Sequence, residues 1–218
     1  MPTKKALIVW GGWDGHEPRQ CSELFAGVLA REGFEVEVST SLEAFADKDK
    51  MQNVSLVVPV WTMGQLGPAQ EAGLLEAVKS GVGLAGFHGG MGDAFRASLG
   101  YQFMTGSQFM AHPGGCVEYE VNIVRKRDPI VKGIKDFKIK SEQYYMHTDP
   151  GNEVLATTTF TDGYDHPWTQ GTVMPTIWKK RWGQGRVFYS ALGHVAREFT
   201  EYPDMLEITR RGMLWAAR

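Results

Sequence analysis

The chain has little cysteine and no long apolar run. Its 218 residues include Cys21 and Cys116, which are too few for a disulfide framework and are typical of a reducing cytosol. No stretch reaches about 18 apolar residues, the length that a membrane-spanning helix needs. The apolar run at 6–10 is too short for the core of a signal peptide. We therefore expect a cytoplasmic protein with no membrane partner.

Positive charge is not in excess either. Lysine and arginine together number 23 against 25 aspartates and glutamates, so the formal net charge is −2. Nucleic-acid binding depends on a basic surface, so nucleic acid is not an expected partner. Hydrophobic residues make up 43% of the chain, which is enough to bury a core and excludes intrinsic disorder as the main state.

Glycine, by contrast, is abundant. The chain has 26 glycines, whereas average usage of about 7% would give about 15. Many fall where predicted strands end, at 11–12, 64, 67, 86–90 and 193. Glycine is common in such turns, but ligands also bind open α/β sheets outside the carboxyl ends of their strands. A histidine lies within four residues of three of these groups (His16, His88 and His194), which favours a pocket at this edge.

The first ninety residues alternate between predicted strands and helices. Strand-like apolar or alternating runs lie at 6–10, 34–39, 54–60 and 83–87, and helical spacing follows at 18–33 and 69–80. Pro59 cannot donate to a ladder, so we expect it at a strand end. A short helix is expected after residue 88, through Phe95 and Leu99. This β-α-β order predicts a mostly parallel central sheet with helices on both faces.

The second half reads as extra β-strands. Strands are predicted at 116–124, 154–159, 176–180 and 187–191, with a hairpin turn at 182–185 and a closing helix at 205–218. The segment 125–150 is rich in lysine and aspartate and is expected to be irregular. No internal repeat and no long linker is present, so we predict a single domain over 1–218.

One strand end carries an unusual histidine. Gly86-Phe87-His88-Gly89-Gly90 follows a predicted strand and matches the G-x-nucleophile-x-G elbow, in which a tight turn projects one side chain over the sheet edge. The side chain is normally serine or cysteine, and here it is His88. Imidazole can act as acid, base, metal ligand or, rarely, nucleophile. A histidine that only caps the next helix is the structural alternative.

Several stretches resemble a known family. They lie at 81–90, 109–113, 128–134, 141–145, 182–194 and 215–216. The most specific of them runs from Gly-Gln-Gly-Arg-Val to Leu-Gly-His within 182–194. On these stretches the sequence resembles ThuA-like (trehalose-utilisation) proteins of the class I glutamine-amidotransferase-like superfamily. The resemblance covers nearly the whole chain and implies a flavodoxin-like three-layer α/β sandwich.

The resemblance also bears on catalysis. It implies that His88 occupies the elbow of the amidotransferase cysteine, so glutamine hydrolysis through a thiolate is not expected. The late catalytic histidine of the superfamily corresponds to His194, with Glu198 four residues further on. Asp128-Pro129 stands where the family commonly has His-Pro, so we expect a structural turn there rather than a ligand.

The candidate site residues follow from these patterns. His88, His194 and Glu142 are the candidate catalytic residues, Glu142 because the family has an acidic residue before its tyrosine. Asp14 could simply cap a helix beside His16, and the tyrosines after Glu142 could lie in an exposed turn. The candidate substrate-binding residues are His16, Trp13, Trp61, His112, Tyr144, Tyr145, His147, Gly89 and Gly90. His166 and Trp168 are read as part of a plain loop.

A metal is a further option. Zinc needs three or four nitrogen, sulfur or oxygen ligands, and the chain has no local H-x-x-x-H or paired-cysteine spacing. Any site must therefore assemble from distant loops. His88, His112, Glu142 and His194 are chemically adequate for a divalent metal such as zinc.

Three functional hypotheses remain open. The first is a cytosolic enzyme of carbohydrate metabolism that isomerises, eliminates from, hydrates or hydrolyses a sugar or 3-keto-sugar derivative; the resemblance implies this substrate class. The second is a non-catalytic sugar-binding or regulatory module, and the third is a metal-dependent hydrolase. A small-molecule sugar is the expected partner. Seven tryptophans and ten methionines suit the interface of a homo-oligomer as well as a core.

Overall fold

A nine-stranded sheet forms the centre of the molecule. A computed structural model describes residues 3–218. The strand order is β2-β1-β3-β4-β11-β10-β9-β6-β7, and a separate ladder joins β5 to β8. The strands are β1 (Lys5–Gly12), β2 (Glu35–Ser39), β3 (Leu56–Thr62), β4 (Gly83–Phe87), β5 (Ser107–Ala111), β6 (Cys116–Ile123), β7 (Phe137–Glu142), β8 (Tyr145–Thr148), β9 (Glu153–Thr159), β10 (Val173–Trp182) and β11 (Gly185–Ser190).

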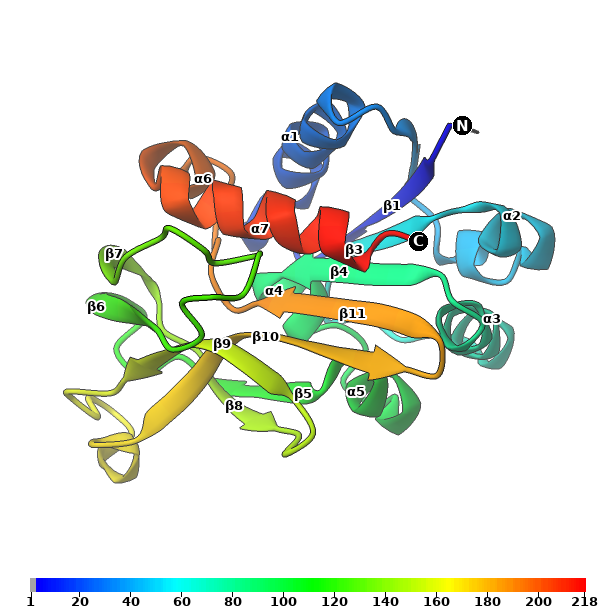
Figure 1. The fold of residues 1–218 in the computed structure, drawn as a ribbon. Helices are drawn as coiled ribbons and strands as arrows, with labels where there is room; N and C mark the ends of the chain where they lie inside the picture. The colour runs from blue at the N-terminus through cyan, green and yellow to red at the C-terminus, as the bar shows by residue number, and fades with distance from the viewer. Residues whose placement is uncertain (1–2) are drawn as a thin grey trace.

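Helices cover both faces of the sheet (Figure 1). One layer holds α1 (Pro18–Arg31) and α7 (Pro203–Ala216), and the other holds α2 (Lys48–Asn53), α3 (Pro68–Lys79) and α5 (Leu99–Thr105). The shorter elements are α4 (His88–Gly92), α6 (Glu198–Glu201), η1 (Asp14–His16), η2 (Leu42–Phe45) and η3 (Pro167–Thr169). The predicted α/β class and flavodoxin-like three-layer arrangement are confirmed.

The sheet is parallel in one half and antiparallel in the other. The strands β2, β1, β3, β4 and β11 run parallel to one another. The pairs β11–β10, β10–β9, β9–β6 and β6–β7 are antiparallel. The extra strands predicted for the second half therefore extend the same sheet.

Burial on both faces explains the unbroken apolar runs. Phe25 and Leu29 of α1 pack on one face of the sheet, and Leu74 and Val78 of α3 pack on the other. The β4 strand is buried along its whole length. A parallel strand covered on both sides has no solvent-facing positions, so its sequence does not alternate.

Three local expectations were wrong. Pro59 lies in the middle of β3, opposite Val9; the ladder from β3 to β4 covers only Leu56 and Val57, so a donor is not needed further along that side. The helix after residue 88 ends at Gly92 and does not continue through Phe95, whose φ is +51°, and α5 begins only at Leu99. The segment 125–150 is not wholly irregular, because it contains β7 and β8.

Within residues 3–218, no helix is both long enough and apolar enough to cross a membrane. The parallel strands bring several loops to one edge of the sheet. The segments after β1, β4 and β11 carry His16, His88 and His194, and β7 brings Glu142 to the same place. Both halves of the chain therefore build the candidate site.

Candidate functional site

A tight turn at the end of β4 presents His88. The φ angle of Phe87 is −145°, in the extended region, whereas that of His88 is +43°. Few residues other than glycine adopt such a backbone conformation, and it is often found at functional sites. The change of direction places the imidazole of His88 at the carboxyl end of the parallel sheet, where it is 1% exposed.

Both ring nitrogens of His88 are held. Nδ1 lies 2.9 Å from the carbonyl oxygen of Ala191, and Nε2 lies 3.0 Å from Oε2 of Glu142. The ring stacks on Tyr144 with its centroid 4.0 Å away. The carbonyl of Ala191 can only accept, so Nδ1 of His88 carries a proton and its Nε2 is the atom that faces the carboxylate.

His16 approaches from the loop after β1. Its Nδ1 lies 2.7 Å from Oγ1 of Thr62, and its Nε2 lies 3.6 Å from Oε2 of Glu142. The edge of the ring meets Trp13 at 4.7 Å between centroids. Gly89 leaves room for this ring, because a Cβ there would lie 2.4 Å from Cε1 of His16.

His194 follows a glycine that no other residue can replace without strain. Gly193 has φ of +98°, and a Cβ there would lie 2.2 Å from the ring of Phe199. The carboxylate of Glu198 accepts hydrogen bonds from the backbone N–H of His194 at 3.0 Å and from Oγ of Ser141 at 2.9 Å. Glu198 therefore ties the His194 loop to β7.

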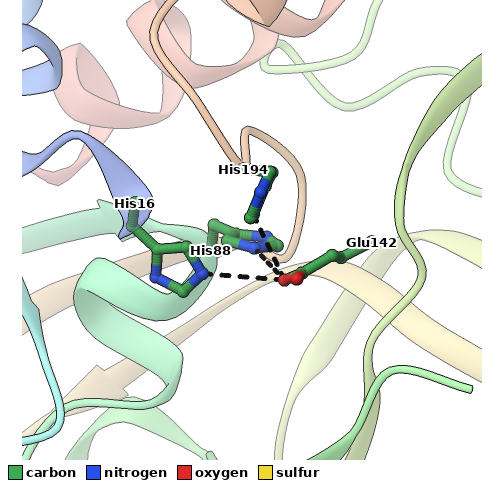
Figure 2. A group of neighbouring side chains, drawn as sticks. All are labelled: His16, His88, Glu142 and His194. Carbon is green, nitrogen blue, oxygen red and sulfur yellow. Dashed lines mark hydrogen bonds and ion pairs between the residues drawn. The ribbon is translucent and has the colours of Figure 1, made fainter. Parts of the chain in front are cut away.

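Glu142 is the centre of the cluster. Figure 2 shows the four side chains pointing toward one another, with the carboxylate between the imidazoles. Nδ1 of His194 lies 3.2 Å from Oε2 of Glu142. Within residues 3–218, the ion-pair partners of Glu142 are all histidines, with no lysine or arginine among them. A buried carboxylate in such a setting needs a proton or a cation beside it.

The protonation behaviour of the cluster is uneven. Burial opposes ionisation of Glu142, but the surrounding imidazoles outweigh it and hold the pKa of its carboxyl below the ordinary value. Burial lowers the pKa of His88 to about 4. Burial acts in the same direction on His194, but the carboxylate of Glu142 overcomes it and raises the pKa of His194.

A metal-capable set is brought together, with a different membership from the expected one. His16, His88, Glu142 and His194 each offer one ligand atom, and these atoms lie within 4.8 Å of one another. His112 stands apart from this set. Its Nε2 faces the other carboxylate oxygen, Oε1 of Glu142, at 3.7 Å, and its side chain is 44% exposed.

Other expected binding residues divide between the cluster and the rest of the fold. Tyr144 is buried against His88, whereas Tyr145 packs on Phe160. His147 is exposed on β8, where it pairs with Gln108.

Three more expected residues lie at the strand ends. Trp13 is 47% exposed beside His16. The Trp61 ring packs against Gly11 and Gly64, and Gly90 packs against Val60. Trp61 and Gly90 therefore support the strand ends, while Trp13 borders the cluster.

Several residues that position the site are not evident from the sequence. Thr62 holds the ring of His16, and its signal was its place at the end of β3, beside Trp61. Ser141 binds Glu198 from the position next to Glu142. Ala191 acts through its backbone carbonyl, which no side-chain pattern could have indicated.

Comparison with known proteins identifies the family. A family model described as ThuA, trehalose utilisation, matches residues 5–216. The chain belongs to the ThuA family. No curated protein matches its sequence significantly.

Solved structures share the fold of this ThuA family member. A protein described as ThuA-like from Bacteroides uniformis ATCC 8492 is 16% identical, with a TM-score of 0.77 over 97% of this chain and 89% of that one. One from Parabacteroides merdae ATCC 43184 is 20% identical, with a TM-score of 0.75 over 99% and 90%. A protein described as cytoplasmic, from Salmonella typhimurium LT2, is 10% identical, with a TM-score of 0.67 over 98% and 100%. At these identities the likeness shows the fold alone.

Proposed function

We propose that this ThuA protein is an enzyme of carbohydrate metabolism that acts on a sugar or 3-keto-sugar derivative. The description of the family, trehalose utilisation, supports the substrate class. The observation that carries the proposal is the convergence of three imidazoles on one carboxylate oxygen, Oε2 of Glu142, at 3.0 to 3.6 Å. The cluster lies at the carboxyl ends of parallel strands, and this edge is where open α/β sheets bind their ligands.

The surroundings suit a sugar. Trp13 offers a half-exposed indole beside His16, and an aromatic face can stack on the apolar C–H face of a sugar ring. His112, with 44% of its side chain exposed, borders the carboxylate of Glu142 on another side. A substrate bound here would place its hydroxyl or carbonyl groups within reach of the imidazoles.

The chemistry is proton transfer. A carbonyl group acidifies the neighbouring C–H bond of a keto-sugar, so isomerisation and elimination both begin with removal of that proton. His88 and His194 act as the acid/base pair in this proposal, and Glu142 orients them. Transfers of this kind contribute about 10²–10⁴-fold in rate.

The proposal includes a cytoplasmic location and a small-molecule sugar as partner. A structural neighbour from Salmonella typhimurium LT2 is described as cytoplasmic. Cys21 is buried and Cys116 is exposed, and both are free thiols, as a reducing compartment would leave them.

The test is turnover by the purified protein on a panel of sugars and 3-keto-sugars. His88→Ala and Glu142→Gln should each reduce turnover by about 10²–10⁴-fold. His166→Ala, which alters a histidine of the loop between β9 and β10 that pairs with Asp165 and lies outside the cluster, is the matched control and should leave turnover unchanged. Unchanged turnover in both cluster variants would overturn the assignment. Sugar binding without any turnover would instead favour a regulatory module.

A further inference from the structure

We propose that His16, His88, Glu142 and His194 bind one divalent transition-metal ion of the manganese-to-zinc series. The ligand atoms are Nε2 of His16, Nε2 of His88, Nδ1 of His194 and Oε2 of Glu142. The inference concerns the side chains of the proposed function but does not rest on it. A bound ion would occupy the lone pair of Nε2 of His88 that proton transfer needs, because Nδ1 of the same ring donates to Ala191. Metal ligation and proton transfer are therefore alternative roles for this ring, and metal binding is measured without reference to turnover.

The tautomer of His88 is the first argument. Its Nδ1 donates to the carbonyl of Ala191, so the neutral ring has a lone pair on Nε2. That lone pair points at Oε2 of Glu142 from 3.0 Å. Two acceptors at this distance repel each other unless a proton or a cation lies between them.

The spacing of the ligand atoms is the second argument. Metal–ligand distances of about 2.0–2.1 Å place neighbouring ligand atoms of a tetrahedron about 3.3 Å apart. The three nitrogens lie 3.0, 3.2 and 3.6 Å from Oε2 of Glu142. Since no two of the four ligand atoms are more than 4.8 Å apart, small rotations of the rings would complete the coordination.

An unsatisfied nitrogen is the third argument. Nδ1 of His194 is buried and makes no hydrogen bond within the described part of the chain, although Oε2 of Glu142 is only 3.2 Å away. Buried polar atoms are nearly always paired, so an unpaired one calls for an explanation. A metal ion in the cluster would receive the lone pair of this nitrogen.

The outer contacts fit a metal site as well. Histidine ligands normally use their second nitrogen in a hydrogen bond that fixes the ring. His88 does so with the carbonyl of Ala191, and His16 does so with Oγ1 of Thr62 at 2.7 Å. Three imidazoles and one carboxylate, with no thiolate, suit zinc, iron, cobalt, nickel or manganese.

The competing arrangement is a shared proton. An imidazolium beside the Glu142 carboxylate would also satisfy the pair, with no metal bound. The two arrangements differ in a measurable way, because a proton gives no stoichiometric, chelator-reversible metal content.

The experiment is a titration of the 218-residue chain with zinc chloride after dialysis against a chelator. Binding is followed by competition with a chromophoric chelator, and cobalt chloride provides a visible absorption band as a second readout. A single ion per chain is expected. Glu142→Gln and His88→Ala should weaken zinc binding by more than about 100-fold, and Thr62→Val, which releases the ring of His16, by about 10–100-fold.

The controls make the outcome decisive. His147→Ala should bind zinc as the unaltered protein does. Absence of stoichiometric binding in the unaltered protein, or equal binding in Glu142→Gln, would overturn the metal site, and the first result does not depend on any variant folding. Turnover by metal-free protein would overturn the metal site as part of the enzyme but leave the proposed function standing. Tight zinc binding without turnover would support the metal site and overturn the proposed function.

Discussion

The imidazole of His88 and the carboxylate of Glu142 meet at 3.0 Å, although 54 residues separate them in the sequence. A nucleophile at a strand-end elbow is exposed to its substrate above the sheet. His88 is instead 1% exposed and is held at both ring nitrogens. The turn after β4 therefore holds the ring of His88 in a buried, fixed position, unlike the exposed side chain of an attacking group.

The close packing of Gly89 predicts a selective loss. A Cβ at this position would lie 2.4 Å from Cε1 of His16 and 2.9 Å from the hydroxyl of Tyr144. We expect Gly89→Ala to displace His16 and to reduce turnover by about 100-fold, the effect of a misplacement of about 1 Å. Overpacking should also lower the free energy of unfolding by about 1–3 kcal/mol.

Gly27→Ala is the matched control for Gly89→Ala. Gly27 lies within α1, and a Cβ there would meet only Nη1 of Arg31 at 3.5 Å. Alanine in a helix interior is favoured over glycine by about 0.5–1 kcal/mol, so this variant should be slightly more stable and fully active. Urea denaturation and steady-state kinetics measure both effects. Equal kinetics in the two variants would contradict the role given to Gly89.

Glu198 is predicted to act as a positioning residue. Its carboxylate accepts from the backbone of His194 and from Ser141, and it does not contact the imidazole of His194 through a hydrogen bond in the described chain. Glu198→Ala leaves both buried donors without an acceptor, which should cost about 1–3 kcal/mol of stability. It should also lower kcat more than it changes KM, because His194 loses its fixed position.

Glu198→Gln provides the rescue. Its amide oxygen can accept the same two hydrogen bonds, so most of the stability and of kcat should return. A variant that recovers stability but not kcat would show that the negative charge of Glu198 takes part in the reaction.

Much of the first half of the fold followed from the sequence. Strands buried on both faces gave nearly unbroken apolar runs, as in the strand predicted at 54–60 and found at Leu56–Thr62. The glycine-histidine groups marked the edge where those strands end. The three histidines His16, His88 and His194 were all singled out, because each follows a predicted strand. Parallel topology alone then brings such positions together.

The second half was harder, for physical reasons. The strands β7 and β8 carry charged and aromatic residues because part of each strand faces solvent. The segment 125–150 therefore contains no apolar run from which these strands could be predicted. For a similar reason the sequence does not show that His16 lies beside Oε2 of Glu142 while His112 faces Oε1. Which histidine reaches Oε2 of Glu142 depends on the contact between His16 and Thr62, which the sequence does not display.

From the positions of the two cysteines, we predict that the reaction at the candidate site does not use a thiol. Cys21 is fully buried, and burial, with smaller effects from Glu17 and Glu198, raises the pKa of its thiol to about 12. Cys116 is exposed and lies opposite Glu142 in the β6–β7 ladder. Iodoacetamide should therefore modify Cys116 in the folded protein and Cys21 only after unfolding, as mass spectrometry will show. Cys116→Ser should retain turnover. If this variant lost turnover, a mechanism that uses the thiol of Cys116 would be supported instead.

The ion pairs of Glu207 lead us to predict how the free energy of unfolding changes at acid pH. The Arg210 guanidinium, then that of Arg211, holds the pKa of the Glu207 carboxyl at about 2, below its ordinary value of 4.5. A depressed pKa stabilises the folded state fully above pH 4.5, and this contribution disappears as the pH falls toward about 2. Because a third of the Glu207 side chain is exposed, we expect the contribution to be at most about 1 kcal/mol.

Glu207→Gln should remove that pH dependence. The difference in unfolding free energy between the variant and the unaltered protein should be largest near neutral pH and should shrink across the acid window, as urea denaturation at several pH values can measure. Glu23→Gln disrupts the more exposed Arg19–Glu23 pair, whose glutamate side chain is 63% exposed, and is the matched control with a smaller expected change. A difference that grows as the pH falls would contradict the expected sign, since only a group with a raised pKa gains stability on that side.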